Sequence, residues 1–247
     1  MIDFLSRDKI ISFLKSIIET QSKNAFGYSF AIDGEWGCGK SWVLAELENQ
    51  LKLDSKNEKK YLIFHYNAWE NDFYEEPLVA ILSVMIDEIE KFCKTEEIVN
   101  GINKSLSSTA LTIFKTVAIS VLNKTLENNT GLDFRDVIDD FGKIKLSDSD
   151  LEKLNKQIDK SLPLRNGLAR IHSQLKALAE KVSIVFIVDE LDRCLPEYAI
   201  KVLERLHHIC YEMPVIQIIA FDKKQLEKSI CQIFGIKDIS SILINKY

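Results

Sequence analysis

Eight residues, 34–41, combine three glycines with a lysine and a hydroxyl side chain in the order Gly-x-x-Gly-x-Gly-Lys-Ser. Glycines let backbone N–H groups curl around phosphate oxygens, and a following helix presents its positive end to them. Lys40 would reach the β- and γ-phosphates, while the Ser41 hydroxyl would hold Mg²⁺. The segment predicts a phosphate-binding loop whose contacts come from Gly34, Glu35, Trp36, Gly37, Cys38, Gly39, Lys40, Ser41 and Trp42.

Two adjacent carboxylates follow an apolar strand candidate. Residues 183–189 read Ser-Ile-Val-Phe-Ile-Val-Asp, and Glu190 comes next. Phosphoryl hydrolysis needs a carboxylate on the metal side and usually a group that orients the attacking water. Acids after apolar strands are common and often only cap loops, so the pair gains its meaning from the phosphate-binding loop upstream. We predict that Asp189 holds the metal and that Glu190 polarises the water.

Two further polar residues have open alternatives. Asp222 follows a strand candidate, where related ATPases keep a residue that senses the γ-phosphate, but it is equally placed to be the N-cap of a helix over 223–234. Arg193 either contacts nucleotide, in its own chain or across a subunit interface, or forms a surface salt bridge with a nearby acid. With Lys40 and Glu190, these two residues complete the predicted catalytic set.

The base specificity of the site is predicted from a missing motif. Guanine recognition usually depends on Asn-Lys-x-Asp, but Asn245-Lys246 is followed by Tyr247 and the end of the chain. No spacing of His and Cys indicates zinc. We therefore predict ATP and Mg²⁺ as the ligands, with Ser41 and Asp189 on the ion.

The elements that must position these residues alternate between strand and helix. Periodicity predicts a helix over 4–18 and strands over 28–33, 60–66, 183–189 and 215–221, with helices after residue 41, from Pro77 and from Pro196. From about residue 96 to 164, Ser, Asn, Lys and Asp interrupt helical runs without a confident strand. We predict an N-terminal helix and first half of the core over 1–95, an inserted helical region over 96–164 and the second half of the core over 165–247.

Composition indicates a soluble cytoplasmic protein. The net charge of -5 argues against a generic nucleic-acid binder, and five cysteines without a Cys-x-x-Cys pair fit no closed disulfide framework. The N-terminus has acids where a signal peptide needs a basic region. The most membrane-like segment, 110–122, is too short to span a bilayer and carries Lys115, which favours a buried amphipathic helix over a membrane-surface helix.

An ordered set of segments resembles the KAP family of P-loop NTPases. Three are uncommon: the Trp inside the phosphate-binding loop, an Asn-Ala-Trp run and an Asp-Glu-Leu-Asp-Arg-Cys run. Together the segments span nearly the whole chain. They are Phe4-Leu5-Ser6-Arg7, residues 34–41, Tyr66-Asn67-Ala68-Trp69-Glu70-Asn71-Asp72, Asp189-Glu190-Leu191-Asp192-Arg193-Cys194 with Pro196, and Ala220-Phe221-Asp222 with Leu226 and Ser229.

The resemblance implies a three-layer α/β/α P-loop NTPase core of the additional-strand type, with a mainly parallel sheet and the acidic strand between the loop strand and the second strand. The family often carries an insert between loop and acidic strand, in some members with membrane-spanning helices, but no segment here qualifies as a spanning helix. Members include animal signalling proteins and bacterial proteins linked to phage exclusion, and the plain form of this chain is more like the bacterial kind.

Three functions fit these features. The leading one is an ATP-hydrolysing switch whose nucleotide sets the conformation of the insert or of a partner, possible roles including anti-phage defence. The second is a module that holds ATP or ADP with negligible turnover. The third, a small-molecule kinase, needs an Arg-rich lid; residues 162–170 could serve, but they read more simply as a connection into the next helix.

The family also sets an expectation for the sheet edge. In that family the segment matching 242–247 is followed by a further strand, which would normally flank the loop strand. The chain ends at Tyr247 with four strand candidates, so strand 28–33 is expected to present an unpaired edge. We predict that the chain is a fragment of a longer protein, or that a partner or second copy covers this edge. The role of the Asn67-Ala68-Trp69 segment stays open between core packing and a nucleotide-dependent switch.

Overall fold

The structure is a computed structural model that describes residues 7–24, 26–54, 61–100, 118, 121 and 164–235. The chain divides into two compact units, one made of Met1–Pro77 with Ala179–Tyr247 and the other of Leu78–Leu178. Most of the predicted insert, 96–164, lies outside the described residues, as does the segment 242–247. The three predicted domain ranges therefore stay predictions.

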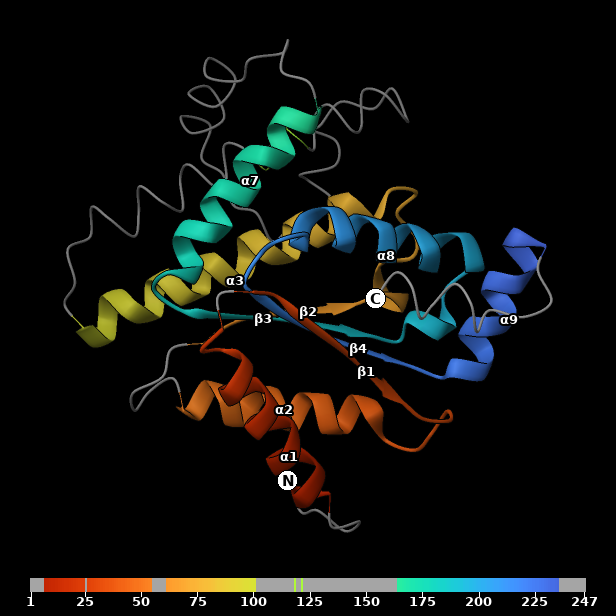
Figure 1. Cartoon of the computed structure of the whole chain (residues 1–247), viewed down its shortest axis with the longest axis horizontal. Helices are drawn as coiled ribbons and strands as arrows, with labels where there is room; N and C mark the ends of the chain where they lie inside the picture. Colours follow the sequence, from red (N-terminus) through yellow and green to blue (C-terminus); the bar gives the residue numbers. More distant parts are fainter. Residues whose placement is uncertain are drawn as a thin grey trace. The chain divides into compact units, whose positions relative to one another are not determined.

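A four-stranded parallel sheet forms the centre of the first unit (Figure 1). Its strands are β1 (Tyr28–Asp33), β2 (Tyr61–Asn67), β3 (Ser183–Asp189) and β4 (Val215–Phe221), in the order β1-β4-β3-β2. Three strands have the predicted bounds, and β2 lies one residue further along than 60–66 because Asn67 still pairs with Asp189.

The strand order confirms the predicted additional-strand arrangement. The acidic strand β3 lies between β2 and the loop strand β1, with β4 as the strand inserted next to β1. All four strands run in parallel, so the ends of β1, β3 and β4 that precede the candidate residues meet at one edge of the sheet. This topology brings a loop at residue 34 beside carboxylates at residue 189.

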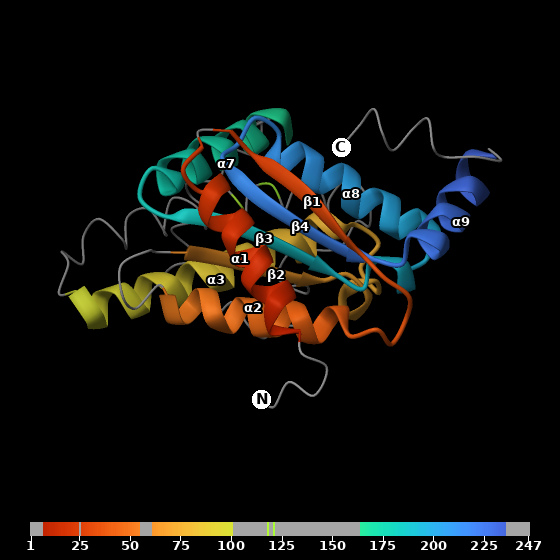
Figure 2. The ribbon, with the colours of Figure 1, turned by 60° about the horizontal axis from the view of Figure 1, so that its bottom comes forward.

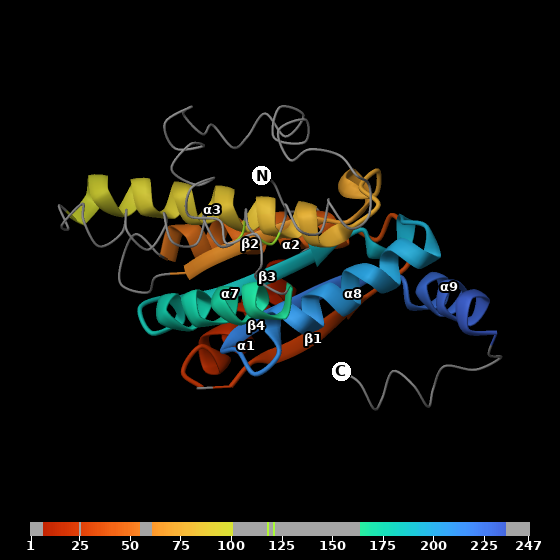
Figure 3. The same ribbon diagram turned by 90° about the horizontal axis from the view of Figure 1, so that it is seen from above.

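Helices cover both faces of this sheet, which gives the first unit three layers (Figures 1 and 2). On one face lie α1 (Asp8–Gln21) and α2 (Lys40–Asp54), and on the other lies α8 (Pro196–Cys210), with α9 (Lys223–Phe234) beside it. Figure 3 shows the α8 side. The face under α1 and α2 is closed by one apolar cluster: Ile11, Leu14, Ile18, Val43, Leu44, Leu47, Leu51, Tyr61, Ile63, Val185, Ile187, Ile216, Ile218 and Ala220.

The first helix differs from its predicted bounds. We predicted 4–18, whereas α1 runs from Asp8 to Gln21. The Arg7 carbonyl accepts the backbone N–H groups of Ile10 and Ile11, which closes the first turn there. Residues 4–6 lie outside the described part of the chain. Because Ile11, Leu14 and Ile18 are buried, this helix holds Arg7 at a fixed place.

Two short 3₁₀ turns continue the strands that matter for function. The first, η1 (Trp69–Asn71), follows β2, and the second, η2 (Leu191–Arg193), follows β3. The Ala68 N–H donates to the Asp189 carbonyl at 2.9 Å, so the β2–β3 ladder extends to the base of both turns. Residues of η1 and η2 are therefore neighbours although they are far apart in sequence.

The second unit contains α3 (Pro77–Asn100) and α7 (Leu164–Ala179) in its described residues. Gly167 packs against the side chain of Val121, where any larger residue would clash. Of the predicted helix over 110–122, only Ala118 and Val121 are described, and both are helical and buried. No described helix has the length and apolar character needed to cross a membrane.

Strand β1 is the edge strand of the described sheet, as expected, since it pairs only with β4 there. Its side chains are exposed or half-buried along its whole length. Whether a partner, a second copy or another segment covers this edge stays a prediction.

Candidate functional site

A tight loop joins β1 to α2 and begins where β1 leaves the sheet. The Gly34 N–H donates to the Phe221 carbonyl at 3.2 Å, which ties the start of the loop to the end of β4. Gly37 and Gly39 have φ angles of 80° and 93°, in the left-handed region that side-chain-bearing residues rarely adopt. The loop therefore has the strand before it, the helix after it and the backbone freedom that the sequence predicts.

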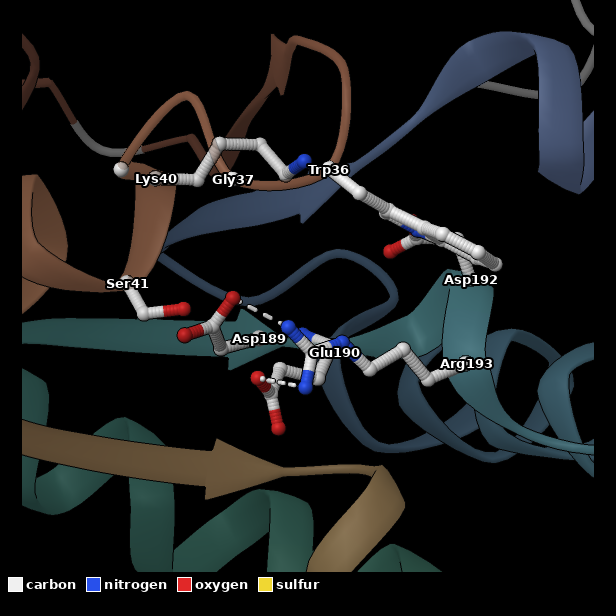
Figure 4. Close-up of a pocket in the computed structure, with 9 residues that line it drawn as sticks. Trp36, Gly37, Lys40, Ser41, Asp189, Glu190, Asp192 and Arg193 are labelled. Carbon is white, nitrogen blue, oxygen red and sulfur yellow. Dashed lines mark hydrogen bonds and ion pairs between the residues drawn. The ribbon is translucent and has the colours of Figure 1, made fainter.

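The loop's lysine and serine stand at the start of α2. Lys40 Nζ donates to the Gly34 carbonyl at 2.5 Å and lies 3.4 Å from the Glu35 carbonyl. The lysine thus bends back over the loop, where a phosphate group would meet its positive charge. In Figure 4 the Ser41 hydroxyl and the Asp189 carboxylate point toward each other.

The acidic pair ends the central strand β3. Asp189 is only 4% exposed, and its Oδ1 accepts the Glu190 N–H at 2.8 Å. Glu190 has φ 57° and ψ 29°, a left-handed conformation that costs a non-glycine residue about 1–3 kcal/mol. This backbone turn sends the two carboxylates in different directions from adjacent positions.

Both oxygens of the Glu190 carboxylate have partners. Arg193 Nη1 lies 2.9 Å from Oε1, and Asn67 Nδ2 donates to Oε2 at 3.1 Å. The Arg193 guanidinium also lies over the Trp69 ring, 5.4 Å from its centroid. For Arg193, the predicted salt bridge with a nearby acid is the contact observed here.

A second contact joins the loop to η2. Trp36 Nε1 donates to Asp192 Oδ2 at 2.5 Å, with Asp192 8% exposed and Trp36 56% exposed. Sequence reasoning gave Asp192 no role, although it lies within the Asp-Glu-Leu-Asp-Arg-Cys run. The indole therefore ties the loop to η2, the turn that follows β3.

These groups surround one cavity of about 170 Å³ (Figure 4). It lies within the first unit, between the phosphate-binding loop and the turn after β3. Its lining brings together both predicted metal ligands and three of the four predicted catalytic residues. The lining residues are Trp36, Gly37, Gly39, Lys40, Ser41, Asp189, Glu190, Asp192 and Arg193.

The oxygen atoms of Ser41 and Asp189 are the kind of ligands that Mg²⁺ takes in nucleotide-binding sites. Mg²⁺ keeps several waters and takes one or two protein oxygens together with substrate phosphates. Ser41 supplies a hydroxyl and Asp189 a carboxylate with one oxygen not engaged by the Glu190 N–H. Among the described residues, no three His, Cys, Asp or Glu side chains cluster into an all-protein metal cage.

Several predicted contacts lie apart from the cavity lining. Asp222 is the N-cap of α9, where its carboxylate accepts the N–H groups of Lys224 at 3.0 Å and Gln225 at 3.4 Å. This is the capping alternative of its prediction, and sensing of the γ-phosphate stays a prediction. Glu35 forms an exposed ion pair with Lys224, and Trp42 lies under a residue that the predicted site did not include.

That additional residue is Arg7. Its Nη2 donates to the Cys38 carbonyl at 3.0 Å, and its guanidinium lies over the Trp42 ring, 5.2 Å from the centroid. Any side chain at Gly39 would collide with it. The Phe-Leu-Ser-Arg segment was a sequence signal, but its place beside the loop follows only from the packing of α1.

Cys194 follows the acidic run but is not a reactive thiol. Burial, reinforced by the nearby carboxylates of Asp72, Asp192 and Glu190, raises the pKa of the thiol to about 12. Its Sγ contacts the Glu190 carbonyl at 3.7 Å. A protonated thiol at neutral pH packs the turn after β3 and takes no part in nucleophilic chemistry.

Comparison with protein families identifies the family of this chain. The sequence from residue 7 to 247 matches the family described as the KAP family P-loop domain. Among curated proteins, no sequence matches this chain. The family match covers both halves of the core and every residue that lines the cavity.

Proposed function

Since the chain belongs to the KAP family of P-loop NTPases, we propose that it binds ATP with Mg²⁺ and hydrolyses it. One observation carries the proposal: the phosphate-binding loop and the acidic pair line the same cavity. Lys40 of the loop and Asp189 of the pair are 149 positions apart in the sequence (189 − 40). Phosphoryl transfer is catalysed mainly by positioning and by charge stabilisation, and these residues supply both.

Each residue has one task in this proposal. The loop N–H groups and Lys40 compensate the charge of the phosphates, with Lys40 moving from the loop carbonyls to the β- and γ-oxygens. Ser41 and Asp189 hold the ion, which when bound neutralises charge on the transferred phosphoryl group. Glu190 orients the water that attacks the γ-phosphorus and accepts its proton.

A second candidate, a module that holds ATP or ADP with negligible turnover, is favoured by one contact pattern. The two carboxylate oxygens of Glu190 are engaged by Arg193 and Asn67, which leaves less acceptor capacity for a water. Multiple-turnover phosphate release, measured with ATP and Mg²⁺ and without an acceptor, separates the candidates. Release beyond one phosphate per chain supports the hydrolase, whereas a single equivalent or none supports the binding module.

The biological role proposed here rests on the family. We propose a nucleotide-dependent switch in the cytoplasm that acts on a protein partner or a second copy of the chain. A link to anti-phage defence rests on bacterial members of that family alone. Free thiols at all five cysteines are compatible with a reducing compartment. Proteins that co-purify only when hydrolysis is blocked would identify the partner.

Removal of the metal should weaken ATP binding by about tenfold or more, because the bound cation is the largest local charge in such a site. Calorimetric titration of ATP with Mg²⁺ and with excess chelator measures the difference. Ser41→Ala removes one proposed metal ligand. It should reduce the gain in ATP affinity that Mg²⁺ gives, and it should leave the ATP affinity measured with excess chelator nearly unchanged. Equal wild-type affinity in both conditions would show that Ser41 and Asp189 do not act through the ion.

A further inference from the structure

The Asn67-Ala68-Trp69 segment contacts the residue proposed to activate water. Asn67 is the last residue of β2, and Glu190 follows β3. Because Asn67 pairs with Asp189 in the sheet, Asn67 and Glu190 lie side by side. The amide is itself fixed: its Oδ1 accepts the Glu70 N–H at 3.2 Å, so Nδ2 faces Glu190. Trp69 is linked to the same carboxylate through Arg193, because the guanidinium lies over the Trp69 ring and pairs with Glu190.

The two partners of Glu190 differ in how firmly they are held. Asn67 is anchored in the sheet and in the first turn of η1. Arg193 has a side chain 41% exposed and also lines the cavity, whereas the Glu190 side chain is 14% exposed. A phosphate with a charge near −2 attracts a guanidinium more strongly than one carboxylate does. Arg193 therefore has a competing partner once a γ-phosphate enters the cavity.

We propose that Asn67 and Trp69 are positioning residues for Glu190, an inference that rests on the proposed hydrolysis. Asn67 keeps one carboxylate oxygen in place throughout. Arg193, steadied by Trp69, holds the other oxygen and transfers to the γ-phosphate, which frees that oxygen to accept a hydrogen bond from the attacking water. Triphosphate binding thereby prepares its own hydrolysis, and diphosphate binding does not.

Kinetics test the role of Asn67. Asn67→Ala should lower kcat for ATP about tenfold, the value of one lost orienting hydrogen bond, with KM changed by about twofold or less. Asn71→Ala is the matched control, because it removes an amide from the same turn that donates to the Asn67 carbonyl and not to Glu190. An unchanged or raised kcat in Asn67→Ala, or an equal fall in Asn71→Ala, overturns the proposal.

Tryptophan fluorescence tests the exchange of Arg193 without relying on turnover. In a Trp36→Phe and Trp42→Phe background, which leaves Trp69 of the three tryptophans, the emission change on adding Mg²⁺ and a non-hydrolysable ATP analogue should exceed the change with ADP, and the excess should vanish in Arg193→Gln. Equal changes with both nucleotides, or an excess that survives in Arg193→Gln, contradict the exchange. If the wild-type protein binds neither nucleotide, it is the proposed function that fails.

Arg7 and Lys40 contact opposite ends of the loop. Lys40 Nζ lies against the carbonyls of Gly34 and Glu35, whereas Arg7 lies against Cys38 and outside the cavity lining. Among the described residues, no carboxylate pairs with Arg7. The one hydrogen bond that the Arg7 side chain makes with a described residue goes to the Cys38 carbonyl. A guanidinium stacked on Trp42 is thus a flat cationic surface, and some of its donors bind no other described residue.

We infer that Arg7 binds the nucleoside end of the nucleotide, again on the premise of the proposed function. Lysine in such loops serves the β- and γ-phosphates, so the sugar and base leave the loop toward residues after Ser41. Trp42 is the first of these residues, and the Arg7 guanidinium lies over its ring. A nucleotide base stacks well on guanidinium and aromatic faces, so it can stack on the Arg7 guanidinium. The ligand class is therefore a nucleotide with its base, not a bare polyphosphate.

Paired ligands test this inference. Arg7→Ala should lower ATP affinity about tenfold and inorganic tripolyphosphate affinity by about twofold or less, at about 0.15 M salt to limit long-range attraction. Lys9→Ala, which removes an exposed positive charge nearby on α1, should leave both affinities unchanged. An equal loss of affinity for both ligands would mean that Arg7 only supports the structure of the loop. Unchanged affinity for both would mean that Arg7 does not contact the nucleotide. Wild-type protein that binds neither ligand would refute the proposed function instead.

Discussion

Lys40→Ala should lower the affinity for ATP by about 30- to 150-fold, which corresponds to the roughly 2–3 kcal/mol of a lost hydrogen bond between charged groups. The loss should be larger for ATP than for ADP, because the lysine is proposed to reach the γ-phosphate as well as the β-phosphate. The backbone cradle alone leaves that terminal charge poorly compensated. Isothermal titration of both nucleotides with Mg²⁺ gives the two ratios.

The matched control is Lys52→Ala, on the last turn of the same helix. Lys52 pairs with Glu48 at the surface, so its loss removes one positive charge from α2 far along the chain from the loop. Nucleotide affinity should stay within about twofold of wild type, since exposed helix pairs contribute little. Unchanged ATP affinity in Lys40→Ala, with the fold intact by circular dichroism, would defeat the assignment of the loop.

Local sequence patterns were sufficient to predict the sheet. The apolar run of β3 is buried on both faces, and such a run has few alternatives to a central parallel strand. Two strand candidates end at an acid, Asp33 or Asp189, and a third is followed directly by Asp222, so these three sets of bounds agree with the structure. The order of the strands came from the family resemblance, because periodicity does not say which strands are neighbours.

The loop and its acids were predictable for a different reason. Phosphate binding demands fixed residue types at fixed spacing within eight positions, so the pattern is visible in one dimension. Asn67 and Glu190 are 123 positions apart, and their contact exists only because β2 and β3 pair in one register. Arg7 reaches Cys38 through the packing of α1 against α2, 31 positions away. Contacts of this kind follow from tertiary structure and leave no spacing to recognise.

Asp222 shows the limit of reading roles from position. A carboxylate at the end of a strand that precedes a helix suits both a sensor and an N-cap, and the same residue type satisfies both. The side chain is 5% exposed and bonds the first turn of α9, while Asp33 accepts the Lys223 N–H at 2.9 Å. The two acids together fix the start of α9 against the end of β1, whatever further role Asp222 has.

Glu190→Gln should retain ATP binding and lose at least about a hundredfold in kcat, the usual range for a general base. The amide keeps the shape of the carboxylate, but it cannot accept the proton of the attacking water. It also loses the ion pair with Arg193 at 2.9 Å, so the guanidinium becomes free to contact phosphate and the affinity for ATP should be equal or higher. Phosphate release under single-turnover conditions, beside a binding titration, separates the chemical step from affinity.

The matched control for this variant is Glu197→Gln, which makes the same change at an exposed position in the first turn of α8. It should hydrolyse ATP at the wild-type rate, because Glu197 does not line the cavity. The decisive comparison is between the two glutamine variants at saturating ATP and Mg²⁺. If Glu190→Gln matches the rate of Glu197→Gln, another group orients the water, and the contacts from Asn67 and Arg193 to Glu190 hold the turn after β3 without serving catalysis.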